Sequence, residues 1–85
     1  MGVRLAVLST FPPTQCGIAT FARSLVTQLS RAGAHVGVVR VVDEPQVQVL
    51  PVVAQWVRGN RFSTDAVART LDDFDVAIVQ HEYGI

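Results

Sequence analysis

Short apolar runs alternate with stretches of helical periodicity along the chain. Val3 to Ser9 is a nearly continuous apolar run, which predicts a short buried parallel strand. Pro12 and Pro13 cannot extend a ladder of hydrogen bonds, so this strand should end by Thr10 or Phe11. The next apolar positions recur at helical spacing, which predicts a helix whose inward face comprises Ile18, Phe21, Ala22, Leu25, Leu29 and Ala32.

Glycine and proline mark the boundaries of the next elements. Gly33 stands where a glycine commonly ends a helix, and His35–Val42 then reads as a second strand. Asp43-Glu44-Pro45 follows as a loop. A third strand is predicted over Val52–Val57, because Pro51 interrupts the apolar run before it.

The last third of the chain predicts one more helix and one more strand. After a turn at Gly59-Asn60, Ser63 or Thr64 should cap a helix with Asp65 in its first turn. One face of this helix should pack inward through Val67, Leu71 and Phe74. Asp75–Gln80 reads as a fourth buried strand.

This order, β-α-β-β-α-β, is typical of the α/β class with an open parallel sheet and flanking helices. The chain, residues 1–85, is long enough for one domain, and we expect its strands to be buried on both faces. If the strands are ordered 3-2-1-4, strands one and four are neighbours. The loops that follow them would then face each other in one cleft, where ligands of such sheets bind.

Composition excludes several classes of function. Hydrophobic residues make up 49% of the chain, which argues against disorder. Seven arginines balance seven acids, so no basic surface for nucleic acid or membrane is indicated. The absence of lysine excludes a Schiff-base or Walker-type lysine within this chain. One cysteine and no apolar run near ~20 residues predict a soluble, cytoplasmic protein.

The stretch TFPPTQCGIATFARSL carries the first candidate site. It places Gly17 at the start of the predicted helix, where backbone N–H groups and the helix dipole favour an anion. The plainer alternative is that this glycine only permits a tight turn. The G-x-G-x-x-G fingerprint of dinucleotide-binding folds is absent, which weakens a NAD interpretation. Cys16 could be reactive beside a helix N-terminus, but a small packed residue is the simpler interpretation.

The final residues, HEYGI, carry the second candidate site. His81 and Glu82 follow the fourth strand, where a titratable pair can donate to, accept from or orient a substrate. The alternative is an exposed polar loop. Two widely separated histidines without a cysteine pair make a poor metal site. Trp56 and Phe62 read as core or cover, because no basic residues interleave with them as in a base-stacking platform.

Together, LSTFPPTQCGIATFARSL and VQHEYGI resemble the start of the retaining glycosyltransferases of family 4, which have the GT-B fold. The resemblance covers essentially the whole chain, although Val42 to Phe62 matches only loosely. It implies two Rossmann-like domains facing across a cleft, with transfer of a sugar from a nucleotide-sugar donor and no metal or other cofactor. The N-terminal domain, of which this chain would be an incomplete part, mainly binds the sugar or lipid-linked acceptor.

The resemblance also implies roles for single residues. Gly17 would be the glycine of the loop that approaches the donor's diphosphate and sugar. His81 would be the catalytic histidine near the transferred sugar, and Glu82 its neighbour in the acceptor region. The substrate-binding positions that flank the glycine would be Gln15, Cys16 and Ile18.

The chain stops at Ile85, whereas the family's nucleotide pocket and the groups that neutralise the leaving diphosphate lie in the second domain. We therefore expect a part of an enzyme, inactive on its own. Strand four would then present an unpaired apolar edge, so we expect self-association or pairing with the missing part. The alternative is a non-catalytic α/β module that binds a phosphate-bearing ligand or a partner chain.

Overall fold

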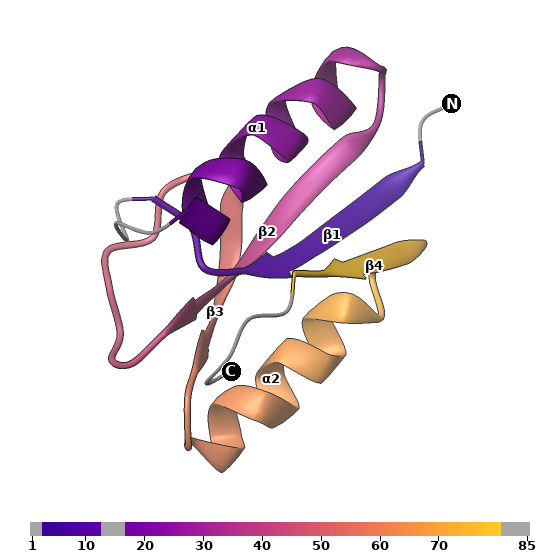
Figure 1. Cartoon of the computed structure of the whole chain (residues 1–85). Coiled ribbons are helices and arrows are strands. Elements are labelled where there is room, and N and C mark those ends of the chain that lie inside the picture. Colours follow the sequence, from indigo (N-terminus) through magenta and orange to yellow (C-terminus); the bar gives the residue numbers. More distant parts are fainter. Residues whose placement is uncertain (1–2, 13–16, 81–85) are drawn as a thin grey trace.

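The computed structural model describes residues 3–12 and 17–80, which form one sheet flanked by two helices (Figure 1). The α/β class and the predicted order of strands and helices are confirmed. The second and third strands have the predicted bounds. In chain order, the elements are β1 (Arg4–Ser9), α1 (Gly17–Arg31), β2 (His35–Val42), β3 (Val52–Val57), α2 (Arg61–Leu71) and β4 (Val76–Val79).

The sheet is parallel throughout, with its four strands in the predicted spatial order, β3-β2-β1-β4. β1 pairs with β2 on one side, where Val7 lies opposite Val38. It pairs with β4 on the other side, where Val7 lies opposite Ile78. The segments that follow β1 and β4 therefore start side by side, at the carboxyl ends of adjacent strands.

The two helices cover opposite faces of the sheet (Figure 1). α1 packs on β1 and β2, whereas α2 packs on β3. The chain moves outward from β1 to β2 and returns across the sheet from β3 to β4. Right-handed crossovers in opposite directions put their helices on opposite faces. No described helix is both long enough and apolar enough to cross a lipid bilayer.

The core on the α1 side is built from small and β-branched side chains. Its buried members are Val7, Phe11, Ala22, Val26, Val38 and Val52, with Val36 and Ile78 packed against them. The prediction that Phe21 and Ala32 face inward is wrong, because Phe21 is 55% exposed and Ala32 is an exposed residue beyond the end of α1. The fully buried Ala19 and Ala22 instead face the sheet, and Phe21 lies about 100° around the helix from Ala22.

The end of α1 is fixed by Gly33, as predicted. Its φ is +96°, in the left-handed region that favours glycine. The Gly33 N–H donates to the Ser30 carbonyl at 3.1 Å, and the Ala34 N–H donates to the Leu29 carbonyl at 3.1 Å. This pair of hydrogen bonds is the Schellman arrangement, which satisfies carbonyls left over at a helix end.

The start of α2 was predicted wrongly. The cap is Asn60, whose side chain accepts a hydrogen bond from the Ser63 N–H at 3.0 Å. The Ser63 hydroxyl is used elsewhere: it accepts from the Val57 N–H at 2.8 Å and donates to the Gln55 carbonyl at 3.1 Å. Because the helix begins at Arg61, its first turn contains no acidic residue. Asp65 therefore lies beyond that turn.

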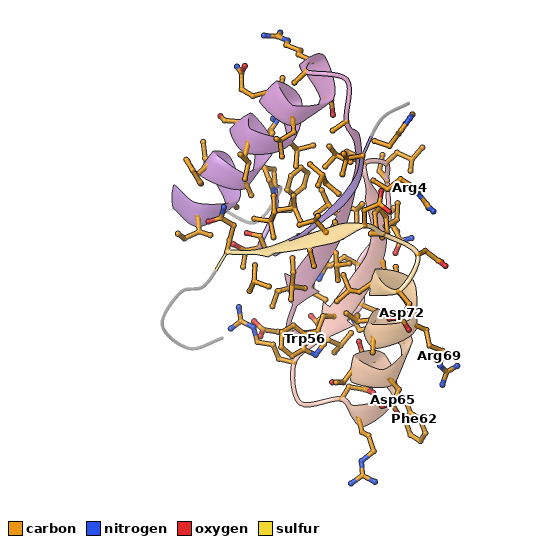
Figure 2. All side chains as sticks on the ribbon, turned by 90° about the vertical axis from the view of Figure 1, so that its right-hand side faces the viewer. Arg4, Trp56, Phe62, Asp65, Arg69 and Asp72 are labelled. Carbon is orange, nitrogen blue, oxygen red and sulfur yellow. The ribbon has the colours of Figure 1, made fainter. Side chains whose placement is uncertain are left out.

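The two aromatic side chains near the start of α2 differ in burial. Trp56 is half-buried and donates from Nε1 to the Thr64 hydroxyl at 3.1 Å, which joins β3 to α2. Phe62 is 83% exposed and points away from the sheet (Figure 2), so the prediction that it belongs to the core or its cover is wrong. Val67 is buried in the packed face, and Leu71 is half-buried.

Phe74 lies after the end of α2, and its half-buried ring is part of the packing against the sheet. The Arg4 guanidinium carbon lies 5.2 Å from the ring centroid, within cation–π range. The next residue, Asp75, makes two hydrogen bonds to the backbone of Arg4. Its carboxylate accepts from the Arg4 N–H at 2.8 Å, and its own N–H donates to the Arg4 carbonyl at 2.8 Å.

The prediction that every strand is buried on both faces is wrong for both edge strands, because β3 is mostly half-buried with Val53 exposed and β4 is largely exposed. Val76 is 49% exposed and Val79 is 59% exposed. β4 is the last strand of the sheet, and neither helix packs extensively on it. Its described residues therefore present an apolar edge.

Gly37→Ala should destabilise the fold. A Cβ at this position would lie 2.7 Å from Cζ of Phe74 and 3.1 Å from Cγ2 of Val53. Crowding of this kind typically costs about 1–3 kcal/mol. Urea denaturation followed by circular dichroism measures the loss. Adding Phe74→Leu should recover part of it, and a double variant whose losses simply add would refute the proposed clash.

Candidate functional site

The carboxyl side of the sheet carries the predicted site as far as the structure describes it. β1 ends at Ser9 and α1 begins at Gly17, so the strand leads into a helix N-terminus as expected. The Gln80 N–H donates to the Leu8 carbonyl at 2.9 Å, which extends the pairing of β4 with β1 by one residue. Of the predicted site residues, Gln15, Cys16, His81 and Glu82 lie outside the described residues.

Gly17 has no evident role within the described fold. It is exposed and helical, whereas positive φ angles occur at Gly33 and Gly59. A Cβ built on Gly17 would meet no atom of the described residues within 4 Å. Among the described residues, neither a positive φ nor crowding requires glycine here. Glycine at this position is compatible both with close approach of a ligand to the backbone and with the turn through residues 13–16, which lie outside the described residues.

Ile18 is half-buried in the first turn of α1. Its position anchors this turn to the packed face of the helix, and the next residue, Ala19, is fully buried. The N-terminus of α1 is therefore held in place by its apolar neighbours while Gly17 stays exposed. This arrangement positions backbone N–H groups at the carboxyl side of the sheet.

An apolar groove opens beside this helix. It has a volume of about 560 Å³ and is lined by Phe11, Pro12, Arg23, Val26, Thr27 and residues 49–52. Residues 43–51 join β2 to β3 without a helix or strand. The sheet face next to α1 therefore lacks the second helix that such a crossover often supplies. The groove can hold a ligand that is largely apolar and has one anionic or hydrogen-bonding group.

Three buried polar residues, Ser9, Thr10 and Arg40, were not among the predicted site residues. Ser9 and Arg40 lie opposite each other on β1 and β2, with exposed fractions of 0% and 6%. The Ser9 hydroxyl has no hydrogen-bond partner in the described structure. A signal was available, because Arg40 is the one charged residue within the run His35–Val42 apart from the terminal histidine.

No family model, curated protein or solved structure matches the chain in comparisons with known proteins. Within residues 3–12 and 17–80, no three side chains of histidine, cysteine, aspartate or glutamate are grouped to hold a metal ion.

Gly17→Ala should stabilise the chain. Alanine is the better helix former, and its methyl group has open space among the described residues, so the free energy of unfolding should rise by up to about 1 kcal/mol. Urea denaturation measures the change. Gly33→Ala is the matched control and should lose stability, because its φ is +96°. If Gly17→Ala also lost stability, the turn itself would require glycine.

Proposed function

We propose that the chain is the acceptor-side, N-terminal part of a retaining family 4 glycosyltransferase with the GT-B fold and a Rossmann-like first domain. One observation carries the proposal. Gly17 begins a fifteen-residue helix at the carboxyl side of the parallel sheet, with open space where a side chain would stand. This is the geometry that a diphosphate needs to reach backbone N–H groups at a helix N-terminus.

The order of the strands supports the same proposal. β4 lies directly beside β1, so residues after Val79 start next to the segment that leads into α1. In this proposal, His81 is the catalytic histidine beside the transferred sugar, and Glu82 contacts the acceptor. Gln15, Cys16 and Ile18 flank the glycine and line the donor and acceptor sites.

The groove beside α1 supports an acceptor role for this chain. Phe11 and Pro12 follow β1 directly, and both line the groove. Arg23 and Thr27, both on α1, add one cation and one hydroxyl to the lining, and the Thr27 hydroxyl donates to the Arg23 carbonyl at 3.0 Å. An acceptor with an apolar portion and a polar end fits this lining, as a lipid-linked sugar would.

Transfer by the complete polypeptide that carries this chain, including any sequence beyond Ile85, tests the proposal. Release of nucleoside diphosphate is followed with a panel of UDP- and GDP-sugars, and NMR spectroscopy assigns the anomeric configuration of the product. Gly17→Val should lower kcat/KM by about 100-fold, because the side chain displaces the diphosphate. His81→Ala should lower kcat to a similar or greater extent, by about 100-fold or more.

Ser24→Val is the matched control, since it places the same side chain at an exposed position of α1 away from its N-terminus. It should leave transfer unchanged. A complete polypeptide that transfers no sugar, combined with phosphate-ligand binding by residues 1–85, would instead establish the non-catalytic binding module.

We further propose that the edge of β4 pairs with another strand, from a longer chain or from a second copy. Its exposed Val76 and Val79 make it an apolar strand edge of the kind that associates. Sedimentation of the 85-residue chain should therefore show self-association that grows with concentration. Val79→Lys should weaken it, whereas Val47→Lys, at a position that is 86% exposed outside the sheet, should not. A monomer that unfolds cooperatively would contradict this proposal.

A further inference from the structure

The Ser9 hydroxyl is buried at the carboxyl end of β1 without a hydrogen-bond partner. None of the surface of Ser9 is exposed, and no partner for its Oγ lies among the residues that the structure describes. Burial of a hydroxyl is unfavourable when no hydrogen bond replaces its hydration, so buried polar groups in native folds are normally paired. An unpaired one indicates a partner that binds from outside the chain, such as a ligand or a water molecule.

Ser9 faces α1 rather than α2. Side chains alternate between the two faces of a strand, so Ser9 and Val7 lie on the same face of β1. Val7 belongs to the core beneath α1, together with Ala22 of that helix. Leu8, between them, lies on the other face, where it lines a small apolar cavity with Val67 of α2. The Ser9 hydroxyl is therefore directed toward the underside of α1.

Along the strand, Ser9 lies level with the first turn of α1. This helix begins on the carboxyl side of the sheet and runs back toward the amino side (Figure 1). A strand rises about 3.3 Å per residue, so Ser9 lies about 6.6 Å beyond Val7. A helix rises about 1.5 Å per residue, so Ile18 lies about 6 Å beyond Ala22 in the same direction. Because Val7 and Ala22 belong to one core cluster, the hydroxyl of Ser9 points at the helix N-terminus.

Two independent features therefore meet at the N-terminus of α1. The helix begins at Gly17, where a Cβ would meet no described atom, and a helix N-terminus favours an anion through its backbone N–H groups and dipole. Ser9 adds a side-chain donor from the sheet below. Donors from a strand and from a helix can contact one phosphate group from two sides, and hydrogen bonds to an anion are stronger than those between neutral groups.

The side chains around Ser9 offer no acceptor for its hydroxyl hydrogen. Arg40 lies opposite Ser9 on β2, and a guanidinium group carries donors only. Val7 and Ala19 are fully buried and apolar. A ligand oxygen that reaches the first turn of α1 supplies the missing acceptor. Because Ser9 is fully buried, this hydrogen bond forms only in the complex, as contacts in binding sites commonly do.

We propose that the Ser9 hydroxyl donates a hydrogen bond to a phosphate group bound at the N-terminus of α1. Ser9 is a ligand-binding residue in this inference and takes no part in a chemical step. The inference rests on the proposed function for the position of the phosphate, and it adds a residue that the predicted site does not contain. Inorganic pyrophosphate and a nucleoside diphosphate present the same acceptor oxygens.

The proposal predicts opposite effects of Ser9→Ala on stability and on binding. In the unliganded chain, alanine removes an unpaired buried hydroxyl, so the urea midpoint should rise. In the complex, loss of the donor should weaken pyrophosphate binding about tenfold. Ser24→Ala, at an exposed position of α1, is the matched control and should leave the affinity unchanged. A purely structural role for Ser9 would change stability without changing affinity.

The experiment is an NMR titration of the ¹⁵N-labelled chain with inorganic pyrophosphate, combined with urea denaturation of each variant. Pyrophosphate should shift the amide signals of residues 17 and 18, and Gly17→Val should abolish binding. Unchanged affinity in Ser9→Ala would overturn the inference, and this result is expected if a buried water molecule satisfies the hydroxyl instead. A parent chain that does not bind pyrophosphate would also overturn it.

Failure of the proposed function gives a different result. If Ser9→Ala and Gly17→Val both weaken pyrophosphate binding but the complete polypeptide transfers no sugar, the phosphate site stands and glycosyl transfer is refuted. If transfer depends on Gly17 while Ser9→Ala binds pyrophosphate as the parent does, glycosyl transfer stands and the role of Ser9 is refuted.

Discussion

The position of β1 between two parallel strands is the constraint on which the rest of the structure depends. Val7, at its centre, is fully buried and lies opposite Val38 on one side and Ile78 on the other. β2 and β3 lie on one side of β1, and β4 lies on the other. The connection from β1 to β2 and the connection from β3 to β4 therefore run in opposite directions across the sheet, and their helices lie on opposite faces. The same pairing puts the carboxyl ends of β1 and β4 side by side, at the edge where open parallel sheets commonly bind ligands.

The sequence predicted the elements best where one physical signal acts alone. The run His35–Val42 and the glycine that ends α1 leave no competing local interpretation, and both were placed as observed. The start of α2 failed because several capping residues follow one another. Asn60 caps the helix, while the Ser63 hydroxyl bonds to β3 across a tertiary contact. Local sequence shows which residues can cap, but a contact with a distant strand decides which one does.

Burial was predicted less well, because it depends on which surfaces the neighbouring elements cover. Phe21 is apolar and at helical spacing, yet the two alanines of α1 allow the helix to approach the sheet and leave the ring outside. β4 has the composition of a buried strand and is nevertheless exposed, since α2 packs on β3. The start of α1 at Gly17 was predicted correctly from the strand-to-helix turn, whereas the role of Gly17 in a site stays a prediction. Arg40 was missed although its charge interrupts the valine-rich run of β2, which was a usable signal.

One residue on the carboxyl side of the sheet departs from the local preference of its element. Gly17 begins α1 at a position where the Cβ of alanine, the better helix former, would meet no atom of the described residues. Elsewhere the local choices agree with the fold, as in the Schellman end of α1 and the cap of α2. Departures from local consistency are expected where binding requires them. Gly17 begins α1 on the carboxyl side of the sheet, where open parallel sheets commonly bind ligands, and this placement supports the proposed use of the helix N-terminus.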